Sequence, residues 1–355
     1  MDTFFGIPVV ITQRSTRRST DHPPFISVLL SGTIVETMAI DLLDSAHFVC
    51  ARSQHVTIQG EALPRLACKL LPIPLPPWDL EHHFCDGSER TVAYCLLLDA
   101  LNFCFFPEPR WEVVVGGKQL QGYYALAAVL KQAFGDGSPI DDFAYLARID
   151  AKTVHRLLQG PIPIGQIPLL EKRGAILREI GRQVTSLYGG RPARLLEISD
   201  GRAQRLINLI VESFSSFRDE ARYAKRRIAF YKRAQIFIAD LFASFQGSSF
   251  GTFCDLDRLT AFADYKLPQI LRAEGILSYS KQLANRVDHK EWIEAGSPEE
   301  VEIRAASIVA VERLRQELAQ QGRNLLAIEV DWLLWNAAQH HPDMPPHHRT
   351  LTTFY

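Results

Sequence analysis

Hydrophobic residues recur at every third or fourth position over most of the chain after Gly122, which is the spacing of amphipathic helices. This period predicts helices at Tyr123–Phe134, Asp141–Ile149, Asp150–Leu158, Pro168–Tyr188 and Arg191–Phe214. Two further strong patterns, Pro298–Gln321 and Leu326–His340, follow near the end of the chain. The aromatic end of the tail, Phe354-Tyr355, predicts that it packs back onto the body. The pattern therefore favours a mainly α-helical fold.

The first third of the chain has a different pattern, rich in proline and in short apolar runs. Candidate strands are Ile7–Thr12, Ser27–Leu30 and the aromatic and branched run Thr91–Phe106, with an amphipathic stretch at Val35–Val49. Trp111–Leu120 reads as a hairpin that turns at Gly116-Gly117. We therefore expect a single domain, 1–355, with a small β element in a mixed part, 1–120, and a helical part, 121–355.

A long helix is predicted from about Ala221 to Phe245, with an apolar stripe facing inward and basic residues on the outer face. These basic residues could hold a phosphate group. Lys232 and Arg233 would do so in one rotation of the helix, and Lys225 and Arg226 in the other. The sequence leaves both choices open.

Composition limits the function classes. The 355 residues are 47% hydrophobic, and 39 basic residues balance 40 acidic ones. This balance argues against a protein that coats nucleic acid or an anionic membrane, because such proteins carry a large excess of positive charge. The longest apolar run, Tyr94–Phe106, contains Asp99 and is too short for a transmembrane helix. With no secretory signal pattern at the N-terminus, we expect a cytoplasmic protein.

The six cysteines form no Cys-x-x-Cys pair and have no regular spacing, so we expect reduced thiols. Histidines occur in pairs at 82-83, 340-341 and 347-348, but their spacing matches no strong zinc motif. We predict no metal site and no cofactor.

Ser216-Phe-Arg-Asp-Glu220 places an aromatic residue, Phe217, two residues before a carboxylate, Asp219. An aromatic ring can stack on a base, and a carboxylate can stabilise a sugar cation. The alternative is that Asp219 only caps a helix.

A second candidate is Asp331-Trp332-Leu-Leu-Trp335-Asn336, within an apolar helix. A carboxylate there must be paired or must face a cavity, because an unpaired buried charge is costly. Asp331 could accept hydrogen bonds from a base edge with Trp332 as a wall, or it could form a salt bridge with an arginine. The sequence does not decide between the two.

Two weaker signals complete the set. His47 follows an apolar stretch and is most simply a structural histidine. Thr260–Ile270 reads as a helix, a tight break and a second helix started by Pro268, a pattern similar to a helix-hairpin-helix but without its glycine-rich turn. Asp264 and Tyr265, within this stretch, are candidates to support the phosphate or the site residues.

Several blocks, in order along nearly the whole chain, resemble the queuosine salvage protein family, the queuosine 5′-phosphate N-glycosylases. They are Leu43–Val49, Leu101–Phe106, Gly122–Tyr124, Ser216–Glu220, Ala229–Gln235, Phe262–Gln269, Glu300–Ala305, Asp331–Trp335, His347–Thr350 and Phe354-Tyr355. The resemblance implies a multi-helix fold related to helix-hairpin-helix DNA glycosylases. It also implies hydrolysis of queuosine 5′-monophosphate to queuine, for salvage into tRNA, and ribose 5-phosphate.

The resemblance also assigns roles to residues. It implies base recognition by His47, Phe217, Asp219, Asp331 and Trp332, with Asp219 as the catalytic carboxylate. Where the family pattern has a second acidic residue after the tryptophan, this chain has Asn336. An amide keeps the hydrogen bonds but loses the charge that would pair with the cationic amine of queuine.

The expected chemistry passes through an oxocarbenium-like sugar, which Asp219 would stabilise or attack. Queuine is a 7-deazapurine, so the leaving base has no N7 to protonate and its charge must spread toward N3 and O6, where His47 could help. Two rivals remain. One is a non-catalytic queuine or nucleotide carrier, and the other is a nucleic-acid glycosylase acting on a flipped base. We expect a small-molecule substrate, no stable nucleic-acid partner and no membrane.

Overall fold

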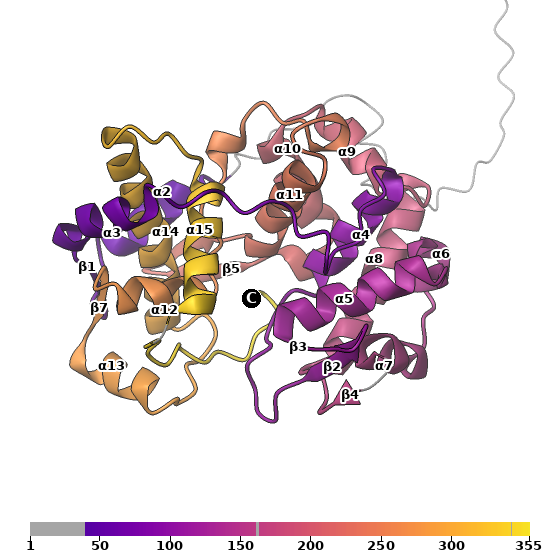
Figure 1. The fold of residues 1–355 in the computed structure, drawn as a ribbon, viewed down its shortest axis with the longest axis horizontal. Coiled ribbons are helices and arrows are strands. Elements are labelled where there is room, and N and C mark those ends of the chain that lie inside the picture. Colours follow the sequence, from indigo (N-terminus) through magenta and orange to yellow (C-terminus); the bar gives the residue numbers. More distant parts are fainter. Residues whose placement is uncertain (1–39, 161–162, 342) are drawn as a thin grey trace, which may run out of the picture. The chain divides into compact units, whose positions relative to one another are not determined.

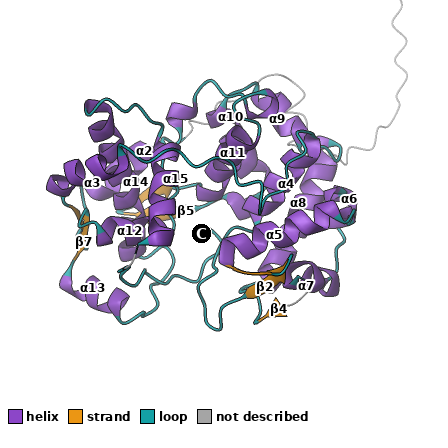
Figure 2. Cartoon of the chain, viewed as in Figure 1, coloured by secondary structure: helices purple, strands orange, loops and turns teal. Residues whose placement is uncertain are grey.

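Helices make up most of the computed structural model, which describes residues 40–160, 163–341 and 343–355 (Figures 1 and 2). The helices are α2 (Leu42–Cys50), α3 (Leu63–Leu70), α4 (Glu89–Ala100), α5 (Gly122–Gly135), α6 (Phe143–Leu146), α7 (Ala151–Gln159), α8 (Leu170–Tyr188), α9 (Ala193–Ser199), α10 (Ala203–Ser213), α11 (Lys232–Ser244), α12 (Lys266–Ala273), α13 (Lys281–Asp288), α14 (Pro298–Gln320) and α15 (Ala327–His340). The mainly α-helical fold class is therefore confirmed. The predicted strands Ile7–Thr12 and Ser27–Leu30 lie outside the described residues.

The strands form three small antiparallel sheets. They are β1 (Val56–Ile58), β2 (Glu112–Val115), β3 (Lys118–Gln121), β4 (Pro163–Ile164), β5 (Glu220–Tyr223), β6 (Arg226–Ala229) and β7 (Leu277–Tyr279). β1 pairs with β7, β2 lies between β3 and β4, and β5 pairs with β6. The hairpin predicted at Gly116-Gly117 is confirmed, because both glycines adopt the positive φ of a two-residue turn.

The prediction of a buried strand at Thr91–Phe106 is wrong, since most of this stretch is α4. Every residue from Thr91 to Ala100 is buried, so the helix has no polar face and the hydrophobic pattern loses its period. Ser88 starts the helix by accepting a hydrogen bond from the backbone N–H of Arg90 at 3.1 Å.

The single helix predicted from Ala221 to Phe245 is also wrong over its first part, from Ala221 to Tyr231. β5 and β6 form a hairpin whose turn residues, Ala224 and Lys225, both have positive φ without being glycine. Only then does α11 begin, at Lys232. Neither Lys225 nor Arg226 belongs to α11, and Arg226 forms an ion pair with Asp44 on α2.

Of the helix-break-helix predicted at Thr260–Ile270, the first helix is not found and the second is α12. The residues before Asp264 form a loop, and α12 starts at Lys266 with Pro268 as its third residue. Arg191–Phe214 is likewise two helices, α9 and α10, separated at Asp200-Gly201, where both residues have positive φ.

The later helices agree with their predicted ranges. α14 is buried along most of its length and packs against α2, α3, α12 and α15. The tail packs back as predicted: Tyr355 is buried, its carbonyl accepts from the N–H of Cys104 at 2.9 Å, and its hydroxyl donates to Glu300 at 2.8 Å. In Figure 1 the C-terminus accordingly lies between α5 and α15.

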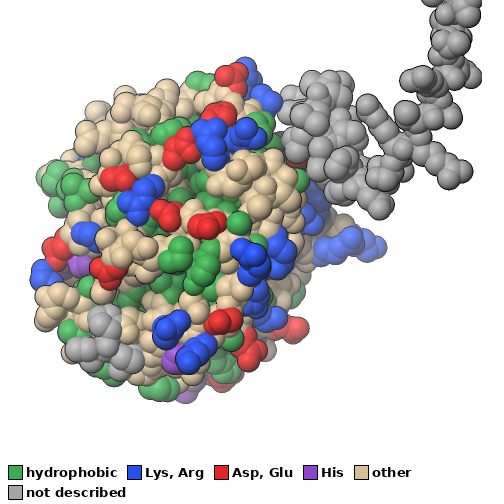
Figure 3. All heavy atoms as spheres, turned by 90° about the vertical axis from the view of Figure 1, so that its right-hand side faces the viewer, with side chains coloured by type: hydrophobic (Ala, Val, Ile, Leu, Met, Phe, Trp, Pro, Cys, Tyr) green, Lys and Arg blue, Asp and Glu red, His purple; other side chains and the backbone are tan. Residues whose placement is uncertain are grey.

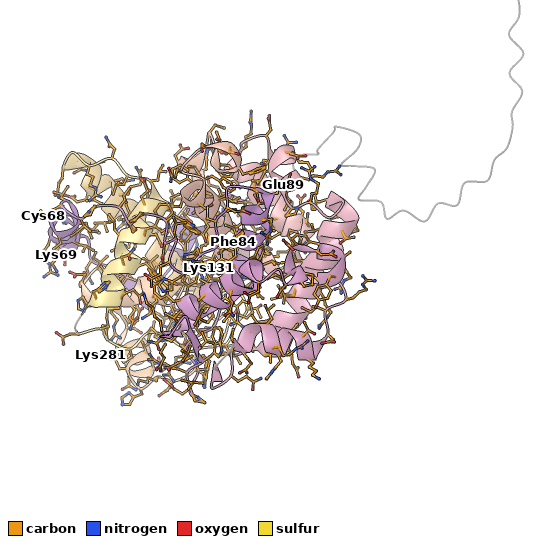
Figure 4. All side chains as sticks on the ribbon, turned by 45° about the vertical axis from the view of Figure 1, so that its right-hand side comes forward. Cys68, Lys69, Phe84, Glu89, Lys131 and Lys281 are labelled. Carbon is orange, nitrogen blue, oxygen red and sulfur yellow. The ribbon has the colours of Figure 1, made fainter. Side chains whose placement is uncertain are left out.

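The segment between α3 and α4 is fixed against α5. Lys131 donates to the carbonyls of Leu80 and Glu81 at 2.7 and 2.9 Å, and the ring of Phe84 lies 5.0 Å from that of Phe134 (Figure 4, where Lys131 and Phe84 are labelled). Within the described ranges, no helix combines the length and apolar character that crossing a membrane requires.

Candidate active site

A cavity of about 560 Å³ lies between α5, α11, α12, α15 and the C-terminal tail. This volume is in the range of sites for small molecules. Its aromatic lining consists of Trp78, Phe103, Phe105, Phe106, Trp111, Tyr123, Tyr124, Phe262, Tyr265, Trp332, Trp335 and Tyr355. Such a lining suits a flat heterocycle, which gains free energy by stacking.

Lys232, the first residue of α11, is the buried cation of the cavity, with 4% of its surface exposed. Its ammonium group donates to the carbonyl of Asn102 at 3.4 Å. Burial lowers the pKa of Lys232, and the nearby carboxyl groups of Asp264 and Asp99 oppose that shift.

Asp331, on α15, is the buried carboxyl group of the same region. Its Oδ1 accepts a hydrogen bond from the backbone N–H of Phe262 at 2.9 Å. Burial raises the pKa of Asp331 well above its ordinary value, and Asp264 adds to this, while Lys232 acts in the opposite direction. The sequence predicted that Asp331 lies on an apolar helix, and this is confirmed. In the structure its side chain also lines the cavity.

Asp264 stands in the loop before α12 and lines the cavity. Its Oδ1 accepts from the backbone N–H groups of Lys266 and Leu267 at 2.8 and 2.9 Å, which holds the carboxylate at the start of α12. Its Oδ2 makes no hydrogen bond to any described residue. One oxygen is therefore fixed, and the other is free for a ligand.

Basic groups gather at another part of the cavity wall, where Arg110, Lys266, Arg349 and His347 lie. Burial lowers the pKa of His347 to about 4, and the positive charges of Lys266, Arg349 and Arg110 contribute to this shift. Arg110 donates to Gln121 at 3.2 Å and to Glu108 at 3.3 Å. Three cations, Arg110, Lys266 and Arg349, repel one another unless an anion lies between them, so this wall makes a suitable phosphate site.

Six of the predicted site residues lie at the cavity. They are Lys232, Asp264, Tyr265, Asp331, Trp332 and Asn336. Asn336 donates through Nδ2 to the carbonyl of Trp332 at 2.8 Å, so part of its amide is used within α15.

The structure does not bring Asp219 to the cavity. This carboxylate is 2% exposed and forms a bidentate pair with Arg304, with Nη1 to Oδ1 at 2.9 Å and Nη2 to Oδ2 at 2.6 Å. Oδ2 also accepts from the backbone N–H of Lys232 at 3.3 Å. Asp219 is thus tied to α14 and to the start of α11, and in this arrangement it supports the position of Lys232.

The remaining predicted residues also lie away from the cavity. His47 is exposed on α2. Phe217 is buried in the core, 5.8 Å from Phe214 between ring centroids. Arg233 is buried, donates to the carbonyls of Ala100 and Ser216, and does not line the cavity.

Sequence reasoning did not identify Arg110, Asp240, Asn102 or His347 as cavity residues, although all four line it. Asp240 could have been found, because it lies eight residues after Lys232 and so falls on nearly the same face of α11. Arg110 could not, because its position depends on how the loop after α4 folds. Among the described residues, no three His, Cys, Asp or Glu side chains converge as metal ligands would.

Comparisons with known proteins give a consistent result. Residues 82–355 match the model of the queuosine salvage protein family. A protein of Sphaerobacter thermophilus named queuosine 5′-phosphate N-glycosylase/hydrolase is 44% identical over 319 residues, covering 89% of this chain and 98% of its own. Proteins of the same name from Mus musculus and Dictyostelium discoideum are 36% and 34% identical, each over 88% of this chain and 98% of its own. The chain therefore belongs to the queuosine salvage protein family.

Proposed function

We propose that this protein hydrolyses the N-glycosidic bond of queuosine 5′-phosphate and releases queuine and ribose 5-phosphate. Its relatives are named for this activity, and this chain matches each of them over nearly their whole length. The observation that carries the proposal is the cavity itself, in which the carboxyl groups of Asp264 and Asp331 and the ammonium group of Lys232 lie between aromatic walls. In the reaction the C1′–N9 bond breaks. The oxygen of a water molecule bonds to C1′ as a hydroxyl group, and the other proton of that water molecule goes to the departing base.

We assign the carboxylate that faces C1′ to Asp264. One of its oxygens is fixed by two backbone N–H groups and the other is free, which suits a carboxylate that must meet a developing sugar cation. Asp219, the carboxylate expected from the sequence, has both oxygens engaged by Arg304. In this proposal Asp219 is a positioning residue for Lys232.

The base would lie against Asp331 and Lys232. Asp331 can accept hydrogen bonds from N1–H and the exocyclic amine of a guanine-like base, and these two donors would favour its charged form. The ammonium group of Lys232 would stabilise the negative charge that spreads over the pyrimidine ring of the departing 7-deazapurine. Trp332 and Phe262 would contact the ring faces, with each stack contributing on the order of 1–3 kcal/mol.

The phosphate would bind to the basic residues of the cavity wall. Lys266 directly follows Asp264 and Tyr265, so a ligand whose sugar meets Asp264 can reach Lys266 with its 5′-phosphate. Arg110 and Arg349 supply further charge. This replaces the earlier candidates Arg233, Lys225 and Arg226, none of which lines the cavity.

We also propose that residues 1–355 act as one domain in the cytoplasm, without a stable nucleic-acid or membrane partner, as the balanced composition indicates. We further propose that the helical fold is distantly related to that of helix-hairpin-helix DNA glycosylases.

The deciding experiment incubates the purified protein with queuosine 5′-monophosphate in the presence of EDTA and follows queuine by mass spectrometry. We expect release of queuine together with ribose 5-phosphate. Tight binding without release would instead indicate a carrier, and neither binding nor release would direct attention to a nucleic-acid substrate.

A further inference from the structure

The middle of α11 carries a further carboxyl group, that of Asp240, into the cavity. Asp240 lies eight residues after Lys232, or about 12 Å further along the helix. Asp240 is 6% exposed and lines the cavity together with Ile236 and Ala243. Its Oδ2 has no hydrogen-bond partner among the described residues. A buried acceptor without a partner is costly, so its presence in a cavity wall points to a ligand that supplies the donor.

Asp99, on α4, is completely buried and lies close enough to Asp240 for the two carboxyl groups to interact. Within the part of the chain that the structure describes, neither of its oxygens has a hydrogen-bond partner. Burial and then the charge of Asp240 raise the pKa of Asp99 well above its ordinary value, and burial raises the pKa of Asp240 to about 8. Burial and mutual repulsion favour the protonated forms of these two carboxyl groups, and a cationic ligand would favour the charged form of Asp240.

The charges in the part of the cavity around Lys232 are unbalanced. Lys232 is the ammonium group that acts on each of Asp99, Asp240, Asp264 and Asp331. A packed core has no reason to retain so many buried carboxyl groups, because apolar residues of the same volume would be at least as stable. The excess of acid over base is what a site for a cationic ligand requires.

Aromatic rings lie at the same part of the cavity. Tyr123 is close enough to Asp240 and Asp99 that their charges raise its pKa, after the larger effect of burial. Its ring centroid lies 6.0 Å from that of Trp335, and both rings line the cavity. A carboxylate beside electron-rich ring faces is the usual environment for an organic ammonium group.

We propose that Asp240, supported by Asp99, binds the protonated secondary amine in the side arm of the queuine base and so selects nucleotides that carry this arm. This inference rests on the proposed function, because the proposed function places the base at Asp331. The side arm of the base would then run along α11 and α15. Asn336, the neutral residue after Trp335 on α15, supplies no charge for this amine, so the charge would come from Asp240 on α11.

The test compares the wild-type protein with Asp240→Asn on two nucleotides. One is queuosine 5′-monophosphate, and the other is 7-deazaguanosine 5′-monophosphate, which has the same ring system without the arm. Single-turnover measurements with excess enzyme make slow cleavage visible. We expect Asp240→Asn to lower kcat/KM about 100-fold for the first nucleotide, the effect of removing one partner of a buried charge pair, and less than threefold for the second.

The ratio of the two values is the decisive quantity, because misfolded protein lowers both values equally and leaves the ratio unchanged. An unchanged ratio in Asp240→Asn would overturn the inference, whether both activities fell together or neither fell. Asp99→Asn should reduce the same ratio to a smaller extent, since Asp99 acts through Asp240. Failure of the proposed function looks different, because the wild-type protein would then release neither base.

Discussion

At the scale of single residues, we propose for the two aspartates Asp219 and Asp264 roles that differ from those the sequence suggested. Asp219 follows an aromatic residue and precedes a basic stretch, which drew attention to it, but Arg304, from 85 positions further along the chain, engages both of its oxygens. Asp264 gave only a weak signal in the sequence, yet it lines the cavity with one free oxygen. Partners that come from distant parts of the chain cannot be read from local spacing.

This assignment predicts different failures for two isosteric variants. Asp264→Asn should lower kcat by about 1,000-fold or more, because the amide cannot offset the charge of the sugar cation, while its stability should change by only about 1 kcal/mol. Asp219→Asn should lower the free energy of unfolding by about 3–5 kcal/mol, because Arg304 would be left buried with too little negative charge around it. Urea unfolding and queuine release, measured on the same preparations, check both expectations.

The outcome that contradicts the assignment is the reverse pattern. Full turnover in Asp264→Asn, together with a stable but inactive Asp219→Asn, would return the catalytic role to Asp219.

Lys266 leads to a prediction about the phosphate. Lys266→Ala should raise KM for queuosine 5′-monophosphate about 10- to 100-fold, the effect of losing one charge-assisted hydrogen bond, with little change in kcat. KM for the nucleoside queuosine should hardly change, because it has no phosphate. Lys281→Ala is the matched control, since Lys281 is an exposed lysine on α13 outside the cavity (Figure 4). Equal effects of Lys266→Ala on nucleotide and nucleoside would place the phosphate elsewhere.

At the scale of elements, the sequence was informative wherever one face of an element is buried and the other is solvated. α8 and α15 match their predicted ranges closely, and the Gly116-Gly117 hairpin has the turn residues that its backbone requires. α4 was mistaken for a strand because it is buried on all sides. The β5–β6 hairpin was missed because Ala224 and Lys225 adopt positive φ, which no residue preference indicates. The cavity walls on α11 and α15 were therefore predictable, and the loops that complete them were not.

The C-terminal tail gives a prediction about pH. Burial, with help from His347 and Arg304, lowers the pKa of His348 to about 3, against about 6.5 in an unfolded chain. Below pH 6.5 the unfolded chain therefore binds a proton that the folded protein does not. His348 should cost about 1.4 kcal/mol of stability for each pH unit between 6.5 and 3.

The variant His348→Gln should remove this contribution. Between pH 7 and pH 5, the wild-type protein should lose about 2 kcal/mol more stability than His348→Gln does, as measured by urea unfolding at both pH values. Equal losses in the two proteins would show that His348 is not buried in its neutral form.

At the scale of the whole molecule, the charge distribution separates a nucleotide hydrolase from a nucleic-acid enzyme. The chain has a formal charge of −1, and the face drawn in Figure 3 carries basic and acidic side chains side by side. The basic residues that line the cavity can bind one phosphate group, but they are too few for the successive phosphates of a nucleic-acid strand. A protein of this kind should recognise a mononucleotide and not a polymer.

Salt tests this conclusion. The logarithm of the affinity of a nucleic-acid-binding protein falls with the logarithm of salt concentration with a slope of about −0.9 for each phosphate contacted on duplex DNA, and about −0.7 on single strands. A single nucleotide has one phosphate, so we expect the slope for kcat/KM on queuosine 5′-monophosphate to be about −1 or shallower between 50 and 300 mM salt. A tRNA that contains queuosine should show no base release at any of these concentrations. Release of queuine from tRNA, with a slope several times steeper, would mean that the polymer is the substrate and that basic residues outside the cavity take part in binding it.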